Sequence, residues 1–169
     1  MMRWRSARRQ RGPVLAASLK LPDPFDVSEL CRTIGRQRGR PIIVSVMPLA
    51  ALGLCGLWLA TEAADHICYE SDTSALHQQH IALHELGHIL CGHGPATPLH
   101  EALAVLFPHL DSKTLKLMLM RRHDSFSISD EWEAETFAYA VLDRVNRSRD
   151  ERGANADDPA TELSRVLED

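Results

Sequence analysis

The sequence predicts an α+β fold in which a small antiparallel sheet packs on one long helix and further helices close the structure. Three observations indicate this fold. A β-branched run at 41–47 is typical of a strand, and two short apolar segments at 57–61 and 65–70 are close enough to pair as an antiparallel hairpin. Apolar residues then recur at helical spacing between N-cap candidates at 71–74 and the C-cap candidate Gly92.

The N-terminal part of the chain is basic, whereas the rest is acidic. Residues 1–40 carry ten Lys and Arg against three Asp and Glu, a net charge of +7, and residues 41–169 carry a net charge of −11. We therefore expect residues 1–24 to form a disordered basic tail. The acidic body argues against a nucleic-acid interface there, so the tail is the candidate segment for binding nucleic acid.

One folded domain is expected over residues 25–147. Asp26 or Ser28 can cap a first helix that continues to about Arg38, and Gly39 ends it. The strands and the long helix described above follow in order along the chain.

Helical patterns recur after Pro95, which ends the long helix. Two short helices are expected at 98–107 and 112–122, and Asp130 is the predicted cap of a longer helix that ends at about Arg147. These helices are expected to close the structure around the sheet.

Residues 148–169 are charged and are expected to form a tail with a short helix over 159–167. The four cysteines form no C-x-x-C pair, which is typical of reduced thiols in a cytoplasmic protein. No apolar stretch has the uninterrupted length of a membrane span, and the apolar run at 14–17 is too short for a signal peptide. We therefore expect a cytoplasmic protein without a membrane partner.

His84, Glu85 and His88 form the pattern H-E-x-x-H within the long predicted helix. Residues four apart lie on one face of a helix, so both imidazoles can reach a single metal ion. Glu85 is turned about 100° from His84, where its carboxylate can contact water at the metal. Two His ligands, an open position and a carboxylate base are most of a zinc hydrolase site. The alternative is an ordinary helix with solvated or core histidines.

A catalytic zinc site takes a third protein ligand. A His six residues after His88 is one known solution, but Gly94 stands there, so that pattern fails. A glutamate from a later helix is another solution, and Glu131, Glu133 and Glu135 are the candidates.

The three glutamates differ in the helical face they occupy. Glu131 and Glu135 share a face, which is typical of a solvated acidic surface. Glu133 instead shares its face with Phe137 and Ala140 and is expected to point toward the core. A carboxylate among apolar neighbours needs a partner, and a metal ion would supply one.

The two motifs together resemble those of the ImmA/IrrE-like zinc metallopeptidases. In that family H-E-x-x-H is followed by a helix of the approximate form E-A-[N/D/E]-x-F-A, which residues 133–138 match. The predicted hairpin also looks like the family's sheet, and the resemblance covers roughly residues 27–147. It implies a zincin-like fold around an active-site helix.

The resemblance further implies that His84, His88 and Glu133 are zinc ligands and that Glu85 is the catalytic base. The long gap between the motifs leaves Glu131 and Glu135 open as alternatives to Glu133, and position 135 is also a candidate partner of a ligand His. The implied function is that of a zinc-dependent regulatory endopeptidase. Its implied partner is a protein substrate such as a helix-turn-helix transcriptional regulator.

In such a mechanism Glu85 takes a proton from water and delivers it to the leaving amine. The oxyanion needs a donor beyond the metal, and His123, Tyr139 and Arg121 are the candidates. The hairpin strand before the helix offers an edge on which an extended peptide can add as a strand.

Two other functions are compatible with the sequence. The first is a non-catalytic binding module, such as the toxin component of a two-protein regulatory system that retains the metal-site fold. The second is a nucleic-acid binder that uses the arginines of residues 3–11. Metal content and the comparison of Glu85→Gln with the wild type distinguish the peptidase from the binding module.

Overall fold

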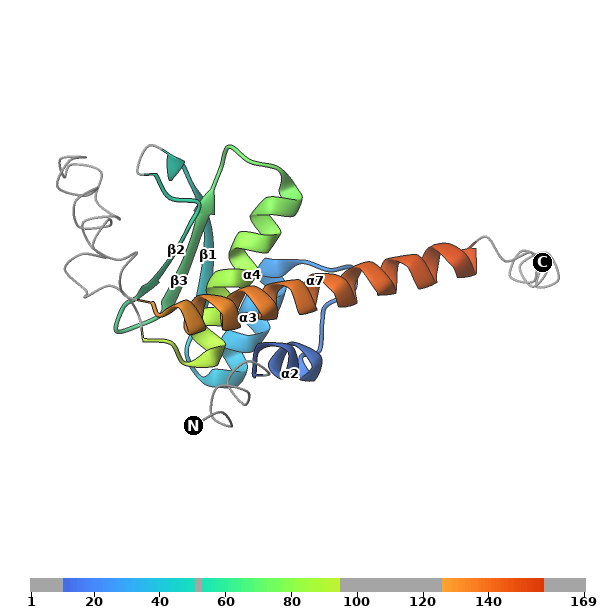
Figure 1. The fold of residues 1–169 in the computed structure, drawn as a ribbon, viewed down its shortest axis with the longest axis horizontal. Helices are drawn as coiled ribbons and strands as arrows, with labels where there is room; N and C mark the ends of the chain where they lie inside the picture. Colours follow the sequence, from blue (N-terminus) through green and yellow to red (C-terminus); the bar gives the residue numbers. More distant parts are fainter. Residues whose placement is uncertain (1–10, 51–52, 95–125, 157–169) are drawn as a thin grey trace.

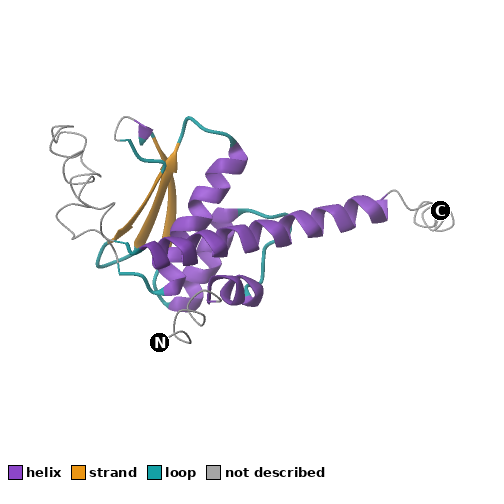
Figure 2. Ribbon diagram, in the orientation of Figure 1, coloured by secondary structure: helices purple, strands orange, loops and turns teal. Residues whose placement is uncertain are grey.

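A computed structural model of the chain describes residues 11–50, 53–94 and 126–156 (Figure 1). Within these residues, three consecutive strands stand between two pairs of helices (Figure 2), and this α+β arrangement confirms the predicted class. The elements are α2 (Arg11–Ser18), α3 (Val27–Arg38), β1 (Ile42–Met47), β2 (Gly56–Ala60), β3 (Asp65–Glu70), α4 (Ala75–Cys91) and α7 (Ile128–Ala156).

The three strands form a mixed sheet in the order β1-β3-β2. The hairpin prediction is confirmed, because β2 and β3 pair antiparallel with Trp58 opposite Ile67. The prediction of a wholly antiparallel sheet is wrong, because β1 pairs with β3 in parallel with Val44 opposite Ile67. Strand β3 therefore lies between β1 and β2 and runs in the same direction as β1.

The first helix and its caps agree with the prediction. The Asp26 side chain accepts a hydrogen bond from the backbone N–H of Glu29 at 2.7 Å, and Gly39 ends α3 with a φ of 66°. On either side of Gly39, Arg38 and Arg40 each place a guanidinium nitrogen 3.1 Å from Asp65 Oδ2. This buried carboxylate ties the end of α3 to the start of β3.

The sheet packs one face on α3 and α4, and α7 lies across α4 (Figure 1). The crossing of α4 and α7 is close, since a Cβ on Gly87 would lie 2.9 Å from the Cα of Ala134. One continuous core joins these layers. Its fully buried members include Leu30, Ile67, Leu83, Leu86, Phe137 and Val141.

The disordered tail predicted over residues 1–24 is wrong from Arg11 onward, where α2 packs on α7. Gly12 and Ala16 are buried, and a Cβ on Gly12 would lie 2.5 Å from the carbonyl oxygen of Glu133. Arg144 donates hydrogen bonds to the carbonyls of Ala16 and Leu19. Small residues four apart allow this close approach, and the basic composition around them concealed it.

The last described helix begins earlier and ends later than predicted. Ser127, rather than Asp130, caps α7: its Oγ accepts from the backbone N–H of Asp130, and the Asp130 carboxylate accepts from the N–H of Ser127. The helix continues to Ala156, so the disordered tail predicted from residue 148 is wrong up to that point. Its last turns extend away from the rest of the fold (Figure 1).

The helices predicted at 98–107, 112–122 and 159–167 lie outside the described residues, as do His123 and Arg121. Among residues 11–50, 53–94 and 126–156, no helix combines the length and the apolar character that a membrane crossing requires.

Candidate metal centre

Helix α4 carries His84, Glu85 and His88 in its last two turns. Ser74 begins the helix by accepting a hydrogen bond from the backbone N–H of His77, and Gly92 ends it with a φ of 71°. His84 and His88 are therefore one turn apart on one face, with their Nε2 atoms 3.0 Å from each other. The two imidazoles converge as the H-E-x-x-H spacing predicts.

Helix α7 brings Glu131 to this histidine pair. Its Oε2 lies 3.3 Å from His84 Nε2, and its Oε1 lies 3.7 Å from His88 Nε2. The expected ligand Glu133 does not contact the pair directly: its Oε2 lies 2.9 Å from His93 Nε2 instead. The close crossing at Gly87 turns the face of α7 that carries Glu131 and Glu135 toward α4.

The donor set could hold a metal ion, because one ligand atom from each residue lies within 4.8 Å of the other two. The two Nε2 atoms are 3.0 Å apart, and Glu131 approaches them through different oxygens, Oε2 at 3.3 Å from His84 and Oε1 at 3.7 Å from His88. Glu131 is half-exposed, and all three residues line a cleft. These residues form a candidate metal centre.

Glu135 orients the His84 ring through a contact at its Nδ1 atom. Its Oε2 lies 3.1 Å from His84 Nδ1 and 3.3 Å from Nε2 of His80. A carboxylate only accepts hydrogen bonds, so His84 Nδ1 carries a proton. The Nε2 atom of the same ring faces Glu131 and His88. Position 135, where the sequence carries Glu and many members of the resembled family carry Asn or Asp, thus contacts a candidate ligand His.

The electrostatic surroundings of the two histidines differ. Burial and the neighbouring His84 lower the pKa of His88 to about 3, so its imidazole is neutral at neutral pH. Burial opposes protonation of His84 too, but hydrogen bonding to Glu131 and the charge of Glu85 together raise its pKa. Negative charge thus accumulates around the pair, which favours a bound cation.

His88 is held by contacts that sequence reasoning missed. The ring of Phe126 stacks on it with centroids 4.0 Å apart, and His93 Nδ1 lies 2.9 Å from His88 Nδ1. The left-handed turn at Gly92 reverses the chain, so that His93 donates its backbone N–H to the carbonyl of His88. The sequence feature that could have indicated these contacts is a polar residue, His93, directly after the C-cap residue Gly92.

A cleft of about 340 Å³ opens beside the histidine pair, between the chain entering β2 and helices α4 and α7. Glu85 lines it together with His84, His88 and Glu131. Gly56 leaves room for this carboxylate, since a Cβ there would lie 2.8 Å from Glu85 Oε1.

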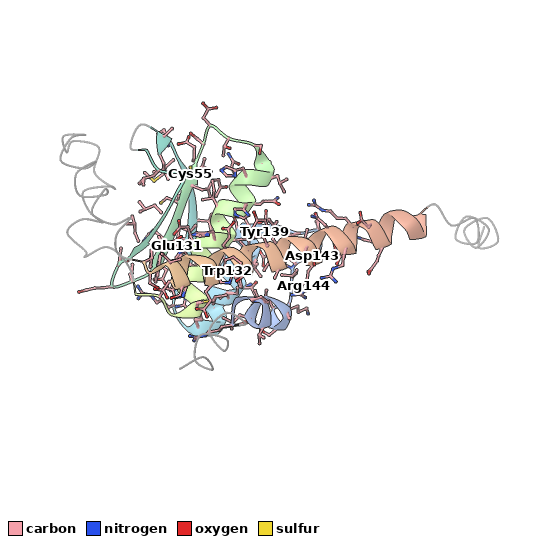
Figure 3. The ribbon with its side chains drawn as sticks, viewed as in Figure 1. Cys55, Glu131, Trp132, Tyr139, Asp143 and Arg144 are labelled. Carbon is pink, nitrogen blue, oxygen red and sulfur yellow. The ribbon has the colours of Figure 1, made fainter. Side chains whose placement is uncertain are left out.

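The two walls of the cleft come from distant parts of the chain. Figure 3 labels Cys55 beside the sheet and Glu131 at the start of α7, and both residues line the cleft. The predicted oxyanion donor Tyr139 is not brought there, because its ring is 60 % exposed and lies against His80, 5.1 Å between centroids.

A second group of potential ligands lies behind His88. Cys91, His93 and Glu133 are all buried, and their ligand atoms lie within 4.8 Å of one another. Glu133 Oε2 is 2.9 Å from His93 Nε2, whereas its buried Oε1 has no hydrogen-bond partner. This group and the His84–His88–Glu131 group are the two that could hold a metal ion within the described part of the chain.

Comparison of the chain with protein-family models, curated proteins and solved structures gave no match. The chemistry of the site is therefore argued from its geometry.

Proposed function

We propose that this protein is a zinc-dependent endopeptidase of regulatory type, and that it belongs with the ImmA/IrrE-like metallopeptidases its motifs resemble. One observation carries the proposal. Two imidazole nitrogens and a carboxylate from a distant helix converge within 3.7 Å of one another, and Glu85 lines the same cleft. Two His ligands and one Glu ligand, with an open position, are the donor set of hydrolytic zinc sites.

His84, His88 and Glu131 would hold the ion, and a bound zinc ion supplies Lewis-acid polarisation of a carbonyl and acidification of water. Glu85 is the general base of the proposed reaction. Its carboxylate takes the proton from the attacking water and passes it to the nitrogen of the leaving amine. Glu85 is half-buried and lines the cleft beside the two histidines, which supports this role.

The edge of the sheet supports an extended peptide as the substrate. In the order β1-β3-β2, strand β2 lies at an edge of the described sheet, and the chain from Gly53 to Leu57 lines the cleft. A peptide that adds alongside β2 through main-chain hydrogen bonds would pass the histidine pair. Strand addition requires an unfolded segment, so the proposed substrate is a protein with an accessible linker.

The proposed partner is a helix-turn-helix transcriptional regulator, which the resemblance of the motifs implies. Such a regulator joins its DNA-binding module to a second module through a linker of this kind. Cleavage there would separate DNA binding from assembly, which is how a protease of this type would act on transcription.

The proposal is tested by incubating the zinc-loaded chain with purified proteins encoded beside it, any helix-turn-helix regulator among them first, with and without a chelator. Wild type should cleave the regulator, Glu85→Gln should retain zinc and cleave nothing, and His84→Ala should lose zinc. Glu62→Gln, an exposed glutamate far along the sheet from the cleft, controls for the substitution itself. If Glu85→Gln cleaves as fast as wild type, the mechanism is wrong, and if both bind the regulator without cleaving it, the protein is a binding module.

A further inference from the structure

A chain of hydrogen-bonded side chains runs from the metal centre into the core. His88 Nδ1 lies 2.9 Å from His93 Nδ1, and His93 Nε2 lies 2.9 Å from Glu133 Oε2. His93 and Glu133 are both buried, and Asp130 places a second carboxylate oxygen 3.6 Å from His93 Nε2. The same His93 and Glu133 also belong to the second group of potential metal ligands.

One proton lies in the hydrogen bond between His88 Nδ1 and His93 Nδ1. The nitrogen that carries this proton decides which of the two candidate ligand groups can bind a metal ion. If His88 Nδ1 carries the proton, the Nε2 lone pair of a neutral His88 is available to the centre. A neutral His93 then carries its proton on Nε2, and this nitrogen has no lone pair left to bind a metal ion. If His93 Nδ1 carries the proton, the assignment reverses and His88 Nε2 is blocked. The two candidate metal sites are therefore mutually exclusive while this hydrogen bond persists.

Glu133 selects between the two arrangements. A carboxylate oxygen 2.9 Å from His93 Nε2 requires a proton on that nitrogen, because two acceptors at this distance repel each other. When a neutral His93 carries its proton on Nε2, its Nδ1 is an acceptor. His88 Nδ1 then donates the hydrogen bond between the two rings. The second carboxylate oxygen, Oε1, is buried without a partner, so the fold retains this acid at a cost in stability. The contact of Glu133 with His93 explains why a carboxylate that lowers stability is kept at this position.

Cys91 fits the same arrangement as a core side chain. Burial, and then the charge of Glu133, raise the pKa of the Cys91 thiol to about 11, so the group is a neutral thiol at neutral pH. In the metal-free protein its surroundings therefore disfavour a thiolate.

We propose that His93 and Glu133 are positioning residues that hold His88 in its Nδ1-protonated tautomer, and that they form no second metal site with Cys91. The inference rests on the metal centre of the proposed function and deepens it: the chain binds one zinc ion, and a buried His–Glu relay sets the direction of one ligand. Such outer partners typically change metal affinity by about 10- to 100-fold.

Zinc affinity and stoichiometry of the full chain, measured by competition with a chromophoric chelator, test the proposal. His93→Leu removes the acceptor for His88 Nδ1 and should weaken zinc binding by about 10- to 100-fold. His93→Gln can accept from His88 and donate to Glu133, so it should restore an affinity near that of wild type. Cys91→Ala should leave one zinc per chain. Each variant's thermal unfolding is recorded, so that a fold defect is recognised.

A second metal site gives the opposite pattern. Two zinc ions per wild-type chain, with one lost in both His93→Gln and Cys91→Ala, would overturn the relay. So would an unchanged affinity in a folded His93→Leu. The cobalt-substituted protein adds a check, because a thiolate-to-cobalt charge-transfer band lost in Cys91→Ala would place the metal at the second group.

The tautomers can also be read without any metal. Long-range ¹H–¹⁵N spectra of the imidazole rings in the metal-free chain should show the proton on Nδ1 of His88 and on Nε2 of His93, and the reverse assignment overturns the proposal. Failure of the peptidase proposal has a different signature. In that case no partner is cleaved, while the affinity order of the His93 variants and the tautomers is still obtained.

Discussion

Single hydrogen bonds decide what each histidine of the centre can do. His84 is fixed by the Glu135 carboxylate at Nδ1, and His88 is fixed by His93 at the corresponding atom. The two Nε2 atoms consequently face each other, 3.0 Å apart, and both lie near the Glu131 carboxylate. A cation bound at this point would be shared by the three groups.

Replacing Glu135 tests the orientation of His84. Glu135→Ala removes the acceptor at Nδ1, so His84 can rotate or protonate on the wrong nitrogen, and zinc affinity should fall by about 10- to 100-fold. Chelator competition measures the affinity. Glu151→Ala, an exposed acid further along the same helix, is the matched control and should bind zinc as wild type does. Equal affinities for the two variants would contradict the role given to Glu135.

Replacing Gly56 tests the placement of the proposed base. A Cβ at this position would lie 2.4 Å from Ile81 Cγ2 and 2.8 Å from Glu85 Oε1, so Gly56→Ala must move one or both side chains. Hydrolysis should fall at least about 10-fold, the size expected when general-base catalysis is disturbed, with zinc content unchanged. Gly94→Ala is the control, because in the described part of the chain no atom beyond its sequence neighbours lies within 4 Å of the added Cβ. Full activity in Gly56→Ala would show that Glu85 is not confined there.

At the scale of elements, the crossing of α4 and α7 assembles the centre. The histidines come from one helix and the carboxylates from the other, and their alignment depends on the contact between Gly87 and Ala134. The H-E-x-x-H spacing predicted the convergence of His84 and His88, since it follows from helix geometry within one segment. Which of three glutamates on α7 faces them depends on how two helices pack, and helical periodicity alone does not contain that information.

Gly87→Ala tests the crossing. The added Cβ would meet Ala134 Cα at 2.9 Å and Phe137 Cδ1 at 3.2 Å, so the helices must separate. Overpacking of this kind costs about 1–3 kcal/mol of unfolding free energy. Zinc affinity should fall with it, because Glu131 moves away from the histidines. Urea unfolding and chelator competition measure both, and Gly94→Ala should change neither. A stable variant with wild-type affinity would show that the crossing is not what sets the donor spacing.

The turn between β3 and α4 is held by the buried carboxylate of Glu70. It accepts hydrogen bonds from the backbone N–H of Asp72 at 2.7 Å and from that of Ala50, in the connection that leads to the cleft. The N–H of Asp72 is the largest cause that lowers the pKa of Glu70 below its ordinary value of 4.5, while burial opposes it. The ionised form is therefore the one that the fold stabilises.

This lowered pKa gives a pH dependence of stability. Glu70 contributes stability above its unfolded-state pKa, and the contribution is lost as the pH falls through its lower folded-state pKa. Glu70→Gln should be less stable than wild type at about pH 7, and the difference should shrink toward about pH 3. Urea unfolding over this range measures it. A difference that stays constant with pH would mean that the charge of Glu70 is not involved.

At the scale of the whole molecule, the elements with strong local signals were predicted and their arrangement was not. Helix α3, the β2–β3 hairpin and α4 agree with the sequence because their caps and periodicities are local. The parallel pairing of β1 was missed, since a strand's pattern does not show its neighbour. Helix α2 was missed because its two buried residues, Gly12 and Ala16, are small. His93 was missed because its role depends on a reversal at Gly92.

The location of the metal is the central claim, and anomalous diffraction at the zinc edge from crystals grown with zinc tests it most directly. The account predicts one peak per chain, bonded to His84 Nε2, His88 Nε2 and a Glu131 oxygen, with Glu85 facing the open side. A peak at Cys91, His93 and Glu133 instead, or no protein-bound zinc at all, would contradict it.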